Sequence, residues 1–213
     1  MFPRINKVIR LIVVADFFYN AAFASFAPIF AIFITEQIEG GSAKVAGFAT
    51  AAYWLTKSIF QLPIARFLDK TDGETDDFWA MFAGYVISGA APLGFLFATE
   101  PWHIYLIQAL LGFTMAWAVP AWYAIFTRHV DKDKIGFEWS LESVFAVGIS
   151  TSGAAALGGY VADTYGFSTL YIASGIIAIT SSFLLLGLKN QLISKKQKGV
   201  MIPSPHNHHA SNF

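Results

Sequence analysis

Three ionisable side chains interrupt long apolar segments of this sequence: Asp16, Lys57 and Glu142. Ionisable groups in such segments are costly, and proteins keep them where they face a cavity, a partner or a substrate pathway. An acid or base held in this way can bind a proton or a polar solute. These three residues are therefore the first candidates for chemistry in the chain.

Asp16 and Lys57 are expected at matching depths. Counted at 1.5 Å per residue from the same ends of antiparallel helices, both lie about 14–17 Å deep. Asp16 shares a helical face with Tyr19, Asn20 and Phe23, a stripe suited to a polar cavity. The spacing predicts that Asp16 and Lys57 pair, either as a substrate or proton site or as a buried structural ion pair.

Glu142 and Gln108 complete the candidate set. Glu142 lies within two turns of the start of its segment, where we expect it to reach cytoplasmic water; a place in the cavity is the alternative. Gln108 is a polar residue inside another apolar segment. We expect a substrate or ion cavity lined by Asp16, Tyr19, Asn20, Lys57, Gln108 and Glu142.

Six apolar segments carry these residues, each longer than twenty residues with at most one charged side chain. A helix needs about 20 apolar residues to cross the hydrocarbon core, so each segment can span a bilayer alone. The sequence predicts an all-α membrane protein whose main partner is the lipid bilayer. The predicted spans are Leu11–Thr35, Val45–Ala65, Phe78–Thr99, Pro101–Thr127, Trp139–Ala162 and Thr164–Leu188.

The charge distribution predicts how the chain is oriented. Hydrophobic residues make up 55% of the chain and charged residues 13%, against roughly 25% charged residues in soluble domains. Twelve of the 14 Lys and Arg residues precede the first segment or follow the second, fourth and sixth. The positive-inside rule then places both termini in the cytoplasm. We expect a cytoplasmic N-terminus (1–10), a six-helix domain (11–188) and a cytoplasmic, disordered tail (189–213), in a bacterial inner (plasma) membrane.

The sequence lacks the residues that other classes of function would require. The chain has no cysteine, and its spans hold no phosphate-binding glycine loop, no nucleophile with a base and no metal-ligand cluster. We therefore expect no enzyme activity, no cofactor and no bound metal. The zero net charge argues against a nucleic-acid partner.

The first three segments are similar to the last three. Residues 28–33 (Pro-Ile-Phe-Ala-Ile-Phe) match residues 120–126 (Pro-Ala-Trp-Tyr-Ala-Ile-Phe) at an offset of 92. Asp69 follows the second segment and Asp163 follows the fifth, at an offset of 94. Because three is odd, the second copy must be inverted in the membrane. Inverted repeats are typical of secondary transporters, whose substrate sites lie between the repeats.

The loop after the second segment resembles a signature of the major facilitator superfamily. In Ala65-Arg-Phe-Leu-Asp69-Lys70-Thr-Asp72-Gly73, the acid and base of that signature are kept, while Ala65 replaces a glycine and the final glycine comes one place late. The resemblance implies that Asp69 and Lys70 act in a gate, because a carboxylate at a helix end can cap a neighbouring helix. A solvated turn is the alternative in this acidic loop.

Two further segments extend the resemblance. Gly148, Gly153, Gly158 and Gly159 give the fifth segment the appearance of the family's glycine-rich helix 5. Such small residues allow close helix packing, and they also permit bending. The fourth segment departs from the family pattern, since Gln108 stands where many proton-coupled members carry Arg.

The resemblance implies a half-size protein, with one six-helix unit of the family's usual twelve helices. It also implies a 3+3 inverted repeat and a secondary active or facilitative transporter of a small solute. A homodimer, or assembly with a second half-transporter, would complete the cavity. The alternative is a membrane scaffold or sensor that keeps the fold without moving solute, because fold alone does not establish function.

Overall fold

A computed structural model of the chain describes residues 5–70 and 73–192, and within these ranges it is helical with no strand. The predicted tail (189–213) lies outside the described residues from 193 onward, as do residues 1–4 and 71–72. The helical elements are α1 (Lys7–Phe26), η1 (Ala27–Ile29), α2 (Phe30–Gln37), α3 (Ala43–Leu68), α4 (Thr75–Gly89), α5 (Ala91–Phe95), α6 (Pro101–His129), α7 (Ile135–Leu141), η2 (Glu142–Ile149), α8 (Ser150–Leu184) and η3 (Leu185–Leu188).

Local signals set where these helices begin. Asn6 caps α1 by accepting the Ile9 amide at 2.9 Å, and Ser42 caps α3 by accepting the Val45 amide at 3.3 Å. Pro101 occupies the first turn of α6, where its missing N–H is not needed. Pro28 lies in the first turn of the short 3₁₀ helix η1, which separates α1 from α2.

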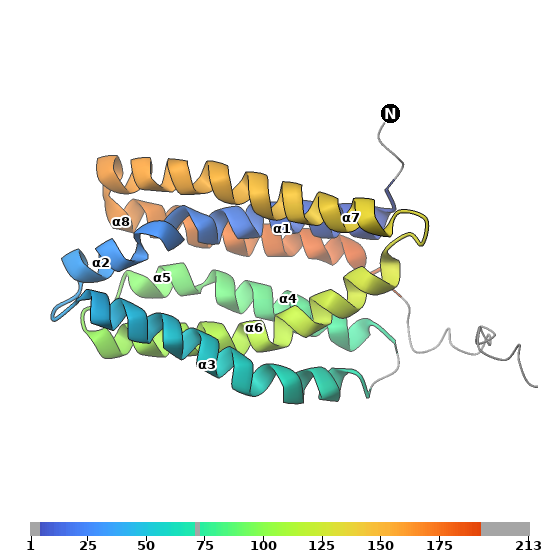
Figure 1. The fold of residues 1–213 in the computed structure, drawn as a ribbon, viewed down its shortest axis with the longest axis horizontal. Coiled ribbons are helices and arrows are strands. Elements are labelled where there is room, and N and C mark those ends of the chain that lie inside the picture. Colours follow the sequence, from blue (N-terminus) through green and yellow to red (C-terminus); the bar gives the residue numbers. More distant parts are fainter. Residues whose placement is uncertain (1–4, 71–72, 193–213) are drawn as a thin grey trace, which may run out of the picture.

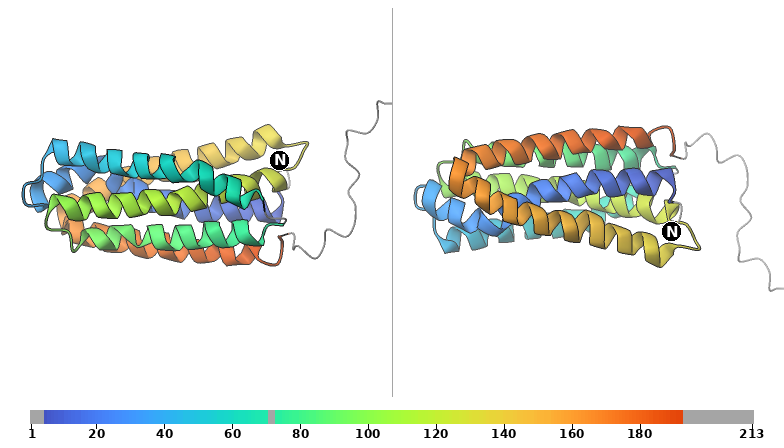
Figure 2. Two further views of the ribbon diagram at one scale, coloured as in Figure 1. Left: turned by 90° about the horizontal axis from the view of Figure 1, so that it is seen from below. Right: turned by 90° about the horizontal axis from the view of Figure 1, so that it is seen from above.

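The helices form an elongated bundle and run along its long axis (Figures 1 and 2). α1 packs against both α8 and η2, while α6 lies between α3 and α4. The start of α1, the start of α7 and the ends of α3 and α8 lie at one end of the bundle (Figure 1). The α2–α3 connection lies at the opposite end. The segments that carry most basic residues thus meet at one end.

Four helical stretches are long and apolar enough to cross a membrane: 7–37, 75–95, 101–129 and 135–188. The last stretch contains Gly166, whose φ of 83° interrupts α8 and lets the chain reverse direction. α3 is not among the four, and it carries Lys57 and Arg66 within its length. The all-α membrane architecture is confirmed, while the six spans and their inverted repeat stay predictions.

Backbone close approaches fix how α1, α3, α6 and α8 pack. A Cβ built on Gly158 would lie 1.8 Å from the Ser25 carbonyl oxygen, and one on Gly112 would lie 2.3 Å from that of Tyr53. Only glycine fits at such contacts. A Cβ on Gly153 or Gly159 would meet nothing within 4 Å. Among the glycines predicted to form a packing face, Gly158 is therefore the one at which the backbone of α8 closely approaches that of α1.

Candidate functional site

Asp16 lies at the centre of the bundle with only 2% of its surface exposed. The Tyr85 hydroxyl donates to its Oδ1 at 2.9 Å, and the Trp122 indole N–H donates to its Oδ2 at 2.5 Å. The three side chains come from α1, α4 and α6. Asp16 therefore joins three helices through hydrogen bonds that a buried carboxylate needs.

Glu142 faces Asp16 from the first residue of η2. It is 7% exposed, and its carboxyl group lies near that of Asp16. The expectation that Glu142 reaches cytoplasmic water is therefore wrong. Its helix turns this side chain inward against α1, onto the same buried face as Ala146 and Ser150.

The element η2 is a π-helix. This form is rare in proteins as a whole, but where it occurs it is often at a functional site. Two contacts hold η2 against α1. The Asn20 side-chain amide donates to the Ala146 carbonyl at 3.1 Å, and the rings of Phe17 and Phe145 stack at 4.7 Å. The π-helical segment is therefore anchored directly beside the two carboxyl groups.

Tyr19 extends the polar network toward α4. Its hydroxyl lies 2.5 Å from the Ser88 hydroxyl, and its ring stacks on Tyr85 with 4.1 Å between centroids. Asp16 with Tyr85 and Tyr19 with Ser88 are each 69 residues apart, so α1 and α4 run parallel here. Sequence reasoning missed Tyr85 and Ser88, because no local pattern distinguishes them from other residues of an apolar helix.

The predicted pairing of Asp16 with Lys57 is wrong. The Lys57 ammonium lies over the rings of Trp54 and Tyr53, 5.0 Å and 5.8 Å from their centroids. These are cation–π contacts within α3 itself. The physical reason is the arrangement of helices: α3 packs chiefly on α6, whereas α1, which carries Asp16, packs chiefly on α8 and η2.

A pocket of about 260 Å³ lies between α1, α3 and α6. Three predicted cavity residues belong to it, namely Tyr19, Asn20 and Gln108. Asp16 precedes Asn20 by one helical turn, and Tyr19 connects the pocket to the carboxyl pair through its stacking on Tyr85. The lining residues are Tyr19, Asn20, Phe23, Tyr53, Gln108, Leu111 and Met115.

A second group of charged residues gathers at the end of the bundle near the start of α1. Arg128 of α6 forms an ion pair with Asp77 of α4 and lies 4.0 Å from Glu74. His129 lies 3.5 Å from the same Glu74 carboxylate. Glu74 and Asp77 are almost fully buried, so these contacts tie the end of α6 to the start of α4.

The α6–α7 turn is held to the start of α1 at this end. The Asn6 amide donates to the His129 carbonyl and to Asp131. Glu138 accepts the Asp131 backbone N–H at 2.9 Å. Hydrogen bonds from Lys134 and then from Asn6 lower the pKa of Asp131.

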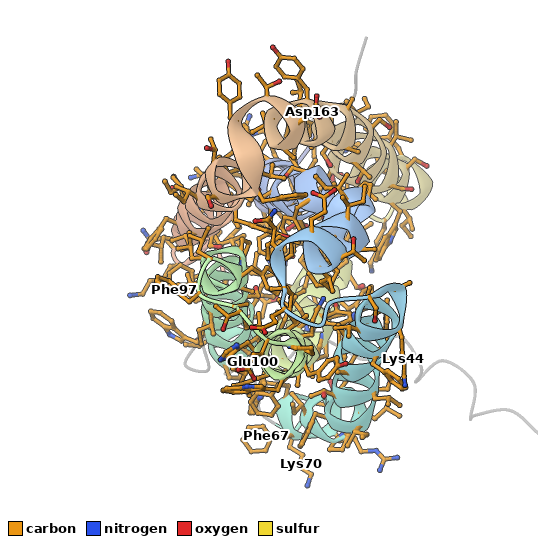
Figure 3. All side chains as sticks on the ribbon, turned by 90° about the vertical axis from the view of Figure 1, so that its left-hand side faces the viewer. Lys44, Phe67, Lys70, Phe97, Glu100 and Asp163 are labelled. Atoms are coloured by element: carbon orange, nitrogen blue, oxygen red, sulfur yellow. The ribbon has the colours of Figure 1, made fainter. Side chains whose placement is uncertain are left out.

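Asp69 and Lys70 lie apart from this charged group. Both are exposed where α3 ends, and the Lys70 side chain points away from the bundle (Figure 3). Neither side chain has an ion pair within the part of the chain that the structure describes. A gate role for them stays a prediction that needs a contact beyond this single chain.

The Major Facilitator Superfamily model matches residues 12–205 of the chain. The match includes the pocket, the carboxyl pair and the charged residues between α6 and α7. A search of curated proteins found no significant match.

Proposed function

The chain belongs to the Major Facilitator Superfamily, and on this premise we propose that it transports a small solute by secondary active or facilitated transport. The observation that carries the proposal is the pocket between α1, α3 and α6, which combines aromatic walls with the polar groups of Asn20 and Gln108. Such a mixture of apolar lining and few polar groups is typical of small-molecule sites.

The proposed topology has six spans in two inverted sets of three. α3 is the second span, and it contributes Tyr53 to the pocket. Gly166 separates the fifth span from the sixth, because its positive φ ends one helical arm before the next begins. Both termini would be cytoplasmic in a bacterial inner (plasma) membrane.

Cysteine labelling tests this orientation, since the chain has no cysteine of its own. A single cysteine at Ser42 should react with an impermeant thiol reagent added to intact cells. A cysteine at Lys132 should react only after the cells are opened. Labelling of Lys132 from outside, with Ser42 protected, would reverse the proposed orientation.

Uptake by proteoliposomes tests the transport function. We expect uptake above that of empty liposomes for at least one member of a small-solute panel. Gln108→Ala should lower this uptake about tenfold, the effect of losing one hydrogen bond to a buried polar group. Gln37→Ala is the matched control, because Gln37 is exposed at the end of α2. A stable protein that moves no solute would favour the scaffold or sensor alternative.

We further propose that two copies assemble in parallel around a two-fold axis along the membrane normal. We call η2 and the part of α8 before Gly166 the η2–α8 arm. A single copy leaves large apolar side chains of α3 and of this arm exposed, including Leu62 at 70% and Leu157 at 66%. A shallow groove runs beside Gly148 and Gly153 on that arm. In the assembly α3 of one copy would pack on the η2–α8 arm of the other. A different half-transporter could take the second place.

Gly153→Leu should weaken dimerisation and transport without unfolding the chain. A Cβ at Gly153 meets nothing within 4 Å in one copy, so the added side chain has room in the monomer. It would collide with a helix packed against this face. Mass measurement in lipid nanodiscs and crosslinking of cysteines at Asp69 and Phe137 on separate copies report the assembly. Transport by a species that remains monomeric would overturn the dimer.

A further inference from the structure

We propose that Lys57 is an anion-binding residue beside the solute pocket, and that the solute is a small organic acid bound as its carboxylate. The inference rests on the proposed function, because it names the class of solute for the same pocket. The observations that carry it are the side of α3 on which Lys57 lies, the aromatic rings under its ammonium group and the neutral lining of the pocket.

Lys57 lies on the packed side of α3. Ile64 and Leu68 follow it by about two and three full turns, and both are buried. Phe48 precedes it by about two and a half turns, which places Phe48 on the opposite side of the helix. A stripe of exposed apolar side chains runs along that opposite side, formed by Phe48, Leu55, Ile59 and Leu62. The Lys57 side chain therefore starts on the side of α3 that packs in the bundle.

The Lys57 ammonium reaches the edge of the pocket. Its Nζ lies 5.8 Å from the centroid of the Tyr53 ring and 5.0 Å from that of the Trp54 ring, so the side chain extends back along α3 by about one turn. Tyr53 lines the pocket. Lys57 thus places a positive charge next to one wall of the pocket. We call this place, at Lys57 and Tyr53, the anion site.

The contact between α3 and α6 holds the anion site against the pocket. A Cβ built on Gly112 of α6 would lie 2.3 Å from the Tyr53 carbonyl oxygen and 3.2 Å from the Lys57 backbone nitrogen. Gln108, one turn before Gly112, and the adjacent Leu111 both line the pocket. The backbone of Lys57 is therefore fixed against the stretch of α6 that lines the pocket.

No acidic side chain neutralises Lys57 among the residues that the structure describes. The cations of the ion pairs in those ranges are Arg128, His129 and Lys134, at the end of α6 and in the turn that follows it. The faces of aromatic rings attract a cation but carry no net charge. A charged side chain within a span is costly without a partner, so the anion site favours an anion that comes from outside the chain.

The lining of the pocket suits the rest of an organic acid. Within the described part of the chain it contains no carboxylate and no cation. The amides of Asn20 and Gln108 can donate to carboxylate oxygens, while Phe23 offers an apolar ring. Asp16 is outside the lining, and both of its oxygens already accept bonds from α4 and α6. A cationic solute would be repelled by Lys57, whereas a neutral solute would leave its charge without a partner.

Thermal unfolding of the protein in lipid nanodiscs tests the anion site with two carboxylate probes, benzoate and phenylacetate. Each probe is compared with its neutral amide, which has nearly the same shape. A ligand that binds the folded chain raises its melting temperature, so at least one carboxylate should raise it more than the matching amide does. Lys57→Met should weaken this binding about tenfold or more, the effect of losing a hydrogen bond to a charged group. Lys57→Arg should keep the binding, because it keeps the charge.

Lys44→Met is the matched control. Lys44 is on the same helix and also lies over an aromatic ring, with its Nζ 5.9 Å from the centroid of the Phe48 ring, but it is exposed at the start of α3. Carboxylate binding by this variant should equal that of the wild type, because the pocket is unchanged. A loss as large as that in Lys57→Met would overturn the assignment to Lys57.

The outcomes separate the anion site from the transport proposal. Carboxylates that stabilise the wild type no more than their amides, or that bind Lys57→Met as tightly as the wild type, would overturn the anion site. Uptake of a neutral or cationic solute that Lys57→Met leaves unchanged would also overturn it, and in that case the transport proposal stands. Carboxylate binding that is lost in Lys57→Met supports the anion site even if no solute in the panel is taken up, so that only the transport proposal fails.

Discussion

Gly158→Ala is expected to disrupt the packing of α8 on α1 and to lower the stability of the whole bundle. The new Cβ would lie 1.8 Å from the Ser25 carbonyl oxygen and 2.5 Å from its carbonyl carbon. Both are backbone atoms, so no side-chain rotation relieves the collision. Overpacking of this kind costs about 1–3 kcal/mol and more where the backbone must move. Thermal unfolding of the purified protein measures the loss.

Gly159→Ala is the matched control for this change. It adds the same methyl group one residue further along α8, where a Cβ meets nothing within 4 Å. Replacing a helical glycine by alanine at such a position should leave stability unchanged or raise it slightly. Equal behaviour of the two variants would show that α1 and α8 do not approach as closely at Ser25 as described.

Asp16→Ala is expected to cause a loss of similar size and to abolish transport. It removes the acceptor for Tyr85 and Trp122 and leaves two buried donors unpaired, at about 1–3 kcal/mol each. Asp16→Asn should be milder, since its carbonyl oxygen still accepts one of the two bonds. Thermal stability and proteoliposome uptake are the measurements.

Asp163→Ala is the control for the loss of an aspartate. Asp163 is exposed at the end of the first arm of α8, at the edge of the bundle in Figure 3. Exposed positions of this kind change stability by less than about 0.5 kcal/mol. If Asp16→Ala unfolds at the same temperature as Asp163→Ala, the network around Asp16 does not stabilise the bundle.

Much of the fold and part of the site could be predicted from the residues. Apolar length and the scarcity of charge predicted a helical membrane protein, because every backbone polar group must be satisfied inside a bilayer. The face of α1 carrying Asp16, Tyr19 and Asn20 was also predictable, since positions three and four apart share one side of a helix. Tyr19, Asn20 and Gln108 do line one pocket.

The order of residues predicts how deep each side chain lies along its helix, whereas the packing of the helices decides which neighbour that side chain faces. Depth follows from the rise per residue, so Asp16 and Lys57 could be placed at similar levels. Their pairing failed because α6 lies against α3 and provides Trp122 to Asp16 instead. The π-helical turn at η2 brings Glu142 to that same carboxylate. Such contacts depend on helix rotation and close packing, which arise from many distant residues at once.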